Sequence, residues 1–252
     1  MIVPILQGGL GNQMFQIANA YAYAKRYNID CKINYNLSYC PNQGNTANKY
    51  TNFFSKIEST DKQFPILYKE KSFSYSQIPL INQDFCIEGY YQSEKYFNDY
   101  ETDIKNLFTF PDEIKTNVDN FIKQFNQPKV GVHIRRGDYV KLSDYHHIQN
   151  MEYYSKAASY FPKYQAFICT DDWQTVNNEV KFTKAIKSPF MNELEDLYLL
   201  SQMDAIIICN SSFSWWASYL GKQKQVIAPK QWFGIKGPQD YQDIYRKDMI
   251  CL

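Results

Sequence analysis

Two adjacent arginines are the residues of this sequence best suited to bind an anion. Arg135 and Arg136 directly follow Lys129–Ile134, whose alternating apolar pattern predicts a buried strand. Parallel α/β sheets bind ligands beyond the carboxyl ends of their strands, and a guanidinium matches the geometry of a phosphate or diphosphate. Asp138 then either orients an arginine or acts as a base. The alternative, a surface loop with a local ion pair, is disfavoured by the position directly after a strand.

A second polar segment lies between the apolar run Ala205–Cys209 and a helical pattern. Asn210, Ser211 and Ser212 occupy it. Either serine can cap the following helix, and hydroxyl groups beside the N–H groups of a helix N-terminus can bind an anion. The serines can equally be simple caps.

The segment Gln7–Gln13 (QGGLGNQ) is a glycine-rich turn between a strand pattern and a helical one. Glycines allow close approach of the backbone to a ligand, and the helix N-terminus favours a diphosphate. A tight turn that simply needs glycine explains the segment equally well. Its spacing matches neither the dinucleotide fingerprint nor the P-loop, so a dehydrogenase or kinase is not supported. Asn12 is the expected N-cap.

The segment Thr170–Asp172 follows another predicted strand. A carboxylate here could accept a hydrogen bond from a nucleobase or a ribose, but capping of the helix from Trp173 is the favoured interpretation. The sequence has no Asp-x-Asp element, which disfavours a metal-bridged nucleotide sugar. His146 and His147 lie in a loop near Asp144, where a histidine close to a cleft could titrate usefully.

The elements that position these residues alternate along the second half of the chain. Strands are expected at Lys129–Ile134, Gln165–Cys169, Ala205–Cys209 and Gln225–Ala228, and helices at Glu152–Phe161, Trp173–Val180, Glu193–Gln202 and Ser212–Gly221. This alternation predicts parallel βαβ units covered on both faces. The start repeats it, with a strand at Ile2–Leu6 and a helix at Asn12–Arg26, whereas residues 34–86 show no clear pattern. We therefore expect domains at 1–126 and 127–252, with the break near Asn126–Pro128.

The overall composition excludes several classes of protein. With 27 Lys+Arg against 26 Asp+Glu, the net charge of +1 disfavours a nucleic-acid binder. The longest apolar runs, Ala20–Ala24 and Ala205–Cys209, are too short to cross a bilayer, and the N-terminus does not resemble a signal peptide. The cysteines at 31, 40, 86, 169, 209 and 251 have no metal-binding spacing. We expect a reduced, soluble, cytoplasmic protein. The 22 tyrosines suit sugar-facing surfaces and core edges alike.

Five segments, in order, resemble the α-1,2-fucosyltransferase family: Gly8–Gln16, Gly89–Phe97, His133–Val140, Asn210–Trp216 and Ile227–Lys230. The resemblance implies an α/β GT-B architecture, with two facing Rossmann-like domains built on parallel sheets. It implies GDP-β-L-fucose as the donor and a galactose-containing oligosaccharide or glycolipid as the acceptor, without a required metal or other cofactor. It also implies at most a peripheral association with the membrane, at its inner face.

The resemblance further implies roles for particular residues. Donor-binding residues would be Gly9, Gly11, Asn12, Gln13, His133, Arg135, Asp171, Asp172, Asn210, Ser211, Ser212 and Phe213. Acceptor-binding residues would be Tyr90, Tyr91 and Gln92. In an inverting single displacement, Arg135 or Arg136 would stabilise the departing GDP. Asp138, Asp144 and His147 are the candidate bases. A different nucleotide-sugar donor and a non-catalytic glycan-binding protein are the competing hypotheses.

Overall fold

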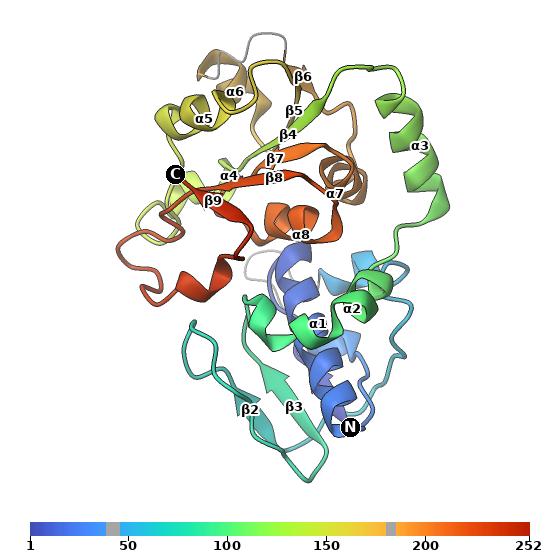
Figure 1. Ribbon diagram of the computed structural model, residues 1–252. Helices are drawn as coiled ribbons and strands as arrows, with labels where there is room; N and C mark the ends of the chain where they lie inside the picture. The colour runs from blue at the N-terminus through green and yellow to red at the C-terminus, as the bar shows by residue number, and fades with distance from the viewer. Residues whose placement is uncertain (39–45, 180–184) are drawn as a thin grey trace. The chain divides into compact units, whose positions relative to one another are not determined.

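The computed structural model describes residues 1–38, 46–179 and 185–252, which form two compact units (Figure 1). The first contains Met1–Thr109 and Asp240–Arg246, and the second contains Phe110–Gln239 and Lys247–Leu252. The boundary therefore precedes the expected break at Asn126–Pro128. The reason is that helix α3 (Asp112–Ile122) packs against a helix of the second unit, α7 (Glu193–Ser201). Cys40 and the helix end expected at Val180 lie outside the described residues.

The first unit has a small parallel sheet whose described strands run in the order β1 (Ile2–Pro4), β3 (Phe85–Glu88) and β2 (Leu67–Lys69). Helix α1 (Leu10–Tyr27) packs against β1, and a shorter helix, α2 (Glu101–Leu107), follows later in the chain. The expected helix is thus present, but it begins two residues early, with Gly9 rather than Asn12 as its N-cap. Where no pattern was clear, the described chain has mainly short 3-10 turns at 35–37 and 47–50, followed by β2.

The second unit has a larger parallel sheet, and its described strands all run in one direction. Their order is β6 (Ile186–Lys187), β5 (Gln165–Thr170), β4 (Lys129–Ile134), β7 (Ala205–Ile207), β8 (Gln225–Ala228) and β9 (Met249–Cys251). Besides α3 and α7, the helices are α4 (Gly137–Lys141), α5 (Met151–Ala158), α6 (Trp173–Glu179) and α8 (Ser212–Leu220). The predicted alternation of strands and helices is confirmed.

Strand β4 shows how both faces of this sheet are covered. Val130, Val132 and Ile134 join a buried cluster with α5. On the other face, a Cβ added at Gly131 would lie 2.8 Å from the side chain of Leu200 on α7. The period-2 pattern of the sequence therefore assigned each residue to the correct face.

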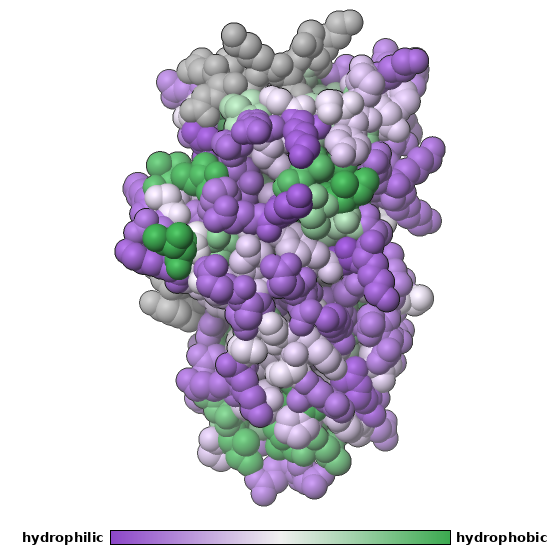
Figure 2. Space-filling view, turned by 60° about the vertical axis from the view of Figure 1, so that its left-hand side comes forward, coloured by the Kyte–Doolittle hydropathy of each residue, from purple (hydrophilic) through white to green (hydrophobic). Residues whose placement is uncertain are grey.

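Aromatic residues account for much of the interior. Tyr23, Tyr91, Phe15, Phe97, Trp215 and Trp216 are among the largest fully buried side chains. On the face shown in Figure 2, polar side chains predominate and hydrophobic ones form separate small patches. No helix within the described ranges is long and apolar enough to span a membrane. The five cysteines that can be described are free thiols.

Candidate active site

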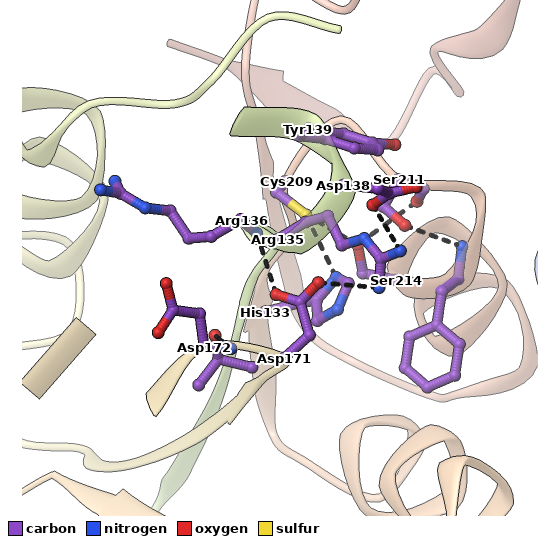
Figure 3. Close-up of polar contacts among 12 residues, drawn as sticks. His133, Arg135, Arg136, Asp138, Tyr139, Asp171, Asp172, Cys209, Ser211 and Ser214 are labelled. Carbon is purple, nitrogen blue, oxygen red and sulfur yellow. Dashed lines mark hydrogen bonds and ion pairs between the residues drawn. The ribbon is translucent and has the colours of Figure 1, made fainter. Parts of the chain in front are cut away.

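The carboxyl ends of three adjacent strands bring the predicted polar segments of the second unit together. β5, β4 and β7 are neighbours in the sheet, and their ends lead into Thr170–Asp172, Arg135–Asp138 and Cys209–Ser212. Figure 3 shows these segments around the guanidinium of Arg135. The topology therefore unites three candidates that the sequence could only name separately.

Two carboxylates orient the guanidinium of Arg135. Its Nη1 lies 2.9 Å from Oδ2 of Asp171, and its Nη2 donates to Oδ1 of Asp138 at 2.7 Å. The guanidinium carbon also lies 5.6 Å from the centroid of the Tyr139 ring. Burial lowers the pKa of Arg135, but the charges of Asp171 and Asp138 outweigh that effect and raise it. The site thus holds a fixed cation in a defined orientation, with the fork geometry suited to a diphosphate.

Asp171 organises the loop as well as the guanidinium. Its Oδ1 accepts a hydrogen bond from the backbone N–H of Arg136 at 2.9 Å. A Cβ at Gly137 would lie only 2.3 Å from Oδ2 of Asp171, so a larger residue there would displace this carboxylate. In Figure 3 the side chain of Arg136 extends to the side opposite the guanidinium of Arg135. The adjacent arginines therefore present their charges in different directions.

Asp172 caps a helix, which was the favoured interpretation of its position. Its Oδ1 accepts a hydrogen bond from the backbone N–H of Thr175 at 3.2 Å, within the first turn of α6. Hydrogen bonding by Thr175 lowers the pKa of the Asp172 carboxyl. The predicted contact of Asp172 with a nucleobase or ribose remains a prediction.

The segment before α8 contains the expected serine cap. Oγ of Ser211 accepts a hydrogen bond from the N–H of Phe213 at 3.3 Å, and Ser212 is the first helical residue. The ring of Phe213 lies against His133, with 5.2 Å between the centroids. The start of α8 therefore lies beside the end of β4, where its N–H groups can support an anion held by Arg135.

The side chain of Asn210 connects the segment before α8 to neighbouring loops. Its Nδ2 donates to the carbonyl of His147 at 2.7 Å and to that of Trp232 at 2.8 Å. Its Oδ1 accepts a hydrogen bond from Nε2 of Gln149 at 3.3 Å. Since the residue is buried and these atoms are engaged within the unit, direct donor binding by Asn210 is corrected to a supporting role.

The three candidate bases have different surroundings. Asp138 is bound to Arg135, and exposed Asp144 pairs with Nζ of Lys236 at 2.7 Å. His147 is half-buried, and its burial lowers its pKa, which keeps the imidazole neutral at physiological pH. The geometry thus favours an orienting role for Asp138, whereas His147 retains the protonation state that a base needs.

The glycine-rich turn belongs to the first unit. Gly8 has a φ of +75°, and a Cβ there would lie 2.5 Å from Nδ2 of Asn12. Nε2 of fully buried Gln13 donates to the carbonyl of Gly8 and to Oγ1 of Thr46, both at 2.8 Å. Gly11 is also buried. The predicted donor contact of the Gln13 side chain is therefore corrected to a bracing role. That of Gly11 stays a prediction, and exposed Gly9 keeps an accessible backbone.

The predicted acceptor segment is only partly accessible. Tyr91 is 2% exposed and donates its hydroxyl hydrogen to the carbonyl of Glu88, so its ring cannot contact a sugar and that assignment is corrected. Buried Gln92 donates from Nε2 to Oδ1 of Asn12 at 2.8 Å, which ties the segment to the glycine-rich turn. Tyr90 is half-buried and remains an acceptor candidate.

Glu70 maintains the unusual backbone of this segment. Its carboxylate accepts hydrogen bonds from the N–H groups of Tyr90 at 2.7 Å and Tyr91 at 2.8 Å. Tyr91 has a φ of +50°, which is rare for a residue other than glycine. Burial raises the pKa of Glu70 to about 7, although the two N–H groups oppose this shift. Asp240 also contributes to the raised value.

The substitution Glu70→Gln should change how stability depends on pH. Because the folded-state pKa lies above the ordinary value of 4.5, the folded protein binds more protons between those limits, and its stability falls as the pH rises from about 4.5 to about 7. The variant lacks this titration, so its Tm should fall less than that of the wild type over this range. Thermal unfolding at several pH values measures the difference. Glu101→Gln, which removes an exposed carboxylate, is the control. If Tm fell equally steeply with pH in Glu70→Gln and in the wild type, the raised pKa of Glu70 would be contradicted.

Three residues with clear structural roles were not selected from the sequence. The hydroxyl of Tyr139 donates to the carbonyl of Asn210 at 3.1 Å. Its ring stacks on that of His146, with 4.2 Å between the ring centroids. Cys209 contacts His133, and Glu70 holds the acceptor segment. Tyr139 and Cys209 adjoin motif residues, which is a usable signal. Glu70 lies in the region without a clear pattern, so nothing local indicated its role.

The parallel sheets and their covering helices form the α/β fold of the GT-B class. The sequence matches Glycosyl transferase family 11 over residues 5–252, and the chain belongs to that family. It is 30% identical to an α-1,2-colitosyltransferase of Escherichia coli, with 92% of each chain covered. It is 23% identical to a galactoside 2-α-L-fucosyltransferase of Caenorhabditis elegans, covering 90% of this chain and 71% of the relative. The α-1,6-fucosyltransferase NodZ, from Bradyrhizobium, was solved after soaking with GDP-fucose; it has a TM-score of 0.59 at 18% identity, with 94% of this chain and 96% of that chain covered.

Proposed function

We propose that this protein is a galactoside α-1,2-fucosyltransferase that uses GDP-β-L-fucose. The observation that carries the proposal is the guanidinium of Arg135, held by Asp138 and Asp171 beside the start of α8. A fixed cation next to a helix N-terminus suits a leaving diphosphate. The names of the relatives support a 6-deoxyhexosyl donor and an α-1,2 linkage.

In the proposed reaction the 2-hydroxyl of a terminal galactose attacks the anomeric carbon of fucose. The bond from that carbon to the diphosphate oxygen breaks with inversion, and the electron pair leaves with GDP. Arg135 stabilises the growing charge, together with the N–H groups of α8, whereas Arg136 points away from this position (Figure 3). The proton of the hydroxyl passes to a base, for which neutral His147 is our first choice and Asp138 and Asp144 are the alternatives.

A second donor is favoured by one specific observation. The relative at 30% identity is a colitosyltransferase, and colitose is L-fucose without its 3-hydroxyl. Both sugars would be transferred from a donor with the same diphosphate leaving group. The contacts around Arg135 therefore do not distinguish the two donors. The choice depends on residues that contact the sugar ring.

A panel of nucleotides and nucleotide sugars tests the proposal. Thermal shifts should show stabilisation by GDP and GDP-fucose but not by UDP, because a ligand that binds the folded state raises its Tm. Incubation with GDP-fucose and a galactose-terminated oligosaccharide should then give a product in which the galactose 2-hydroxyl is substituted. GDP-colitose in parallel separates the two donors. Stabilisation by UDP alone, or GDP binding without transfer to any galactoside, would overturn the proposed activity.

The proposal includes independence of a metal ion, because guanidinium groups and helix N–H groups can themselves stabilise the leaving diphosphate. EDTA in the transfer assay should therefore leave the rate unchanged, and loss of activity that magnesium or manganese restores would contradict this. We further propose that the protein acts in the cytoplasm on an oligosaccharide or glycolipid, with at most peripheral membrane association and without nucleic acid as a partner.

A further inference from the structure

The thiol of Cys209 contacts a residue of the proposed donor site. Its Sγ is 3.1 Å from Nδ1 of His133. The hydroxyl of Ser214 is more distant, at 3.9 Å. Cys209 and His133 are both buried, at 1% and 6% exposure. Figure 3 shows the sulfur directly above the imidazole, at the base of the loop that carries Arg135.

The contact defines which ring nitrogen carries a proton. Burial lowers the pKa of His133 to about 3 and raises that of the Cys209 thiol to about 12, so both groups are neutral. A neutral imidazole has one N–H and one acceptor nitrogen. Of a thiol sulfur and an imidazole nitrogen, the nitrogen is the better hydrogen-bond acceptor. The S–H group therefore donates to Nδ1, and the ring proton is on Nε2.

We propose that Cys209 is a positioning residue for nucleotide binding, which holds His133 in the Nε2–H tautomer through the contact between Sγ and Nδ1. This inference rests on the proposed function, because the N–H of Nε2 is useful toward an anionic ligand. With the proton on Nδ1 instead, Nε2 would direct a lone pair at the phosphate oxygens and weaken binding. A hydroxyl can replace the thiol as the donor to Nδ1 of His133, whereas a methyl group cannot.

The test combines the spectrum of the histidine rings with the affinity for GDP. The chain has three histidines, so nitrogen-15 NMR of the imidazoles gives few signals, and His133→Gln identifies the signals of His133. The wild type and Cys209→Ser should both show the Nε2–H tautomer for His133. Cys209→Ala should show a mixture of tautomers and bind GDP about ten-fold more weakly, as expected for one impaired hydrogen bond to an anion.

Cys169→Ala is the matched control. Cys169 is a buried cysteine of the same sheet, opposite His133 in the β4–β5 register, and its removal leaves a comparable gap. It should leave both the tautomer and the GDP affinity unchanged. The wild-type spectrum needs no variant, so the inference stays testable if Cys209→Ala folds poorly.

Several results would overturn the inference. They are an Nδ1–H tautomer in the wild type, a Cys209→Ala protein with unaltered tautomer and GDP affinity, or a Cys209→Ser protein that behaves like the alanine variant. A change of tautomer without weaker GDP binding would overturn the link to nucleotide binding. Failure of the proposed function appears separately, as a wild-type protein that neither binds GDP nor transfers fucose.

Discussion

Replacing Arg135 with lysine should lower kcat/KM for fucosyl transfer by about 100- to 1,000-fold, the usual effect of removing one preorganised charge-stabilising group. Lysine keeps the positive charge but places it on a single nitrogen. It cannot bridge Asp171 and Asp138 and still face a diphosphate, as the guanidinium fork can. Steady-state kinetics with GDP-fucose and a galactoside, together with GDP titrations, measure the loss.

Arg26→Lys is the control for this substitution. Arg26 forms a 3.5 Å ion pair with Asp99 in the first unit, where a lysine can take its place. It should retain kcat/KM within about two-fold, because such surface pairs contribute little. An Arg135→Lys enzyme within three-fold of the wild type would remove this guanidinium from the proposed mechanism.

The substitution Trp215→Ala should produce the largest loss of stability, about 3–5 kcal/mol, which is typical of deleting a buried aromatic side chain. Trp215 is fully buried on α8 and stacks on Tyr219 with 5.3 Å between the ring centroids. It also contacts Trp216 at 5.2 Å. Because α8 begins at the proposed site, GDP should bind this variant more weakly too. Chemical unfolding followed by circular dichroism measures the free energy.

Tyr160→Ala provides the comparison, since Tyr160 is an aromatic residue of the same unit with 43% exposure. The Tyr160→Ala substitution should change the free energy of unfolding by about 0.5 kcal/mol, which is usual for surface positions. If both variants unfolded at the same denaturant concentration, the packing of Trp215 on α8 would not contribute the expected stability. The proposed support of the site by α8 would then be wrong.

The second unit was largely predictable because its local patterns agree with its tertiary structure. β4 and β8 were predicted with their observed ends, and the alternation along β4 identified its buried face. Ser211 was correctly expected as a cap, since a helix start needs a hydrogen-bond acceptor there whatever surrounds it. Parallel topology then brought the strand ends together.

The remaining features depend on contacts between residues far apart in the sequence. Asn12 has the side chain of an N-cap, but its Oδ1 accepts from Gln92, eighty positions away, and Gly9 caps the helix. The backbone N–H of Tyr91 is bound by Glu70, which lies in the region without periodicity. The domain boundary depends on the docking of α3 against α7, and no local signal marks it.

The path of the chain determines how this protein can be divided. It passes from the first unit to the second after Thr109, returns for Asp240–Arg246, and ends in the second unit with β9. The returning segment is bound in the first unit, where Asp243 accepts a hydrogen bond from the N–H of Tyr75 at 2.8 Å. A single cut therefore cannot yield two complete halves. Chimeras that exchange one whole unit between relatives need three matched junctions, and a deletion from residue 240 onward removes a piece of each unit.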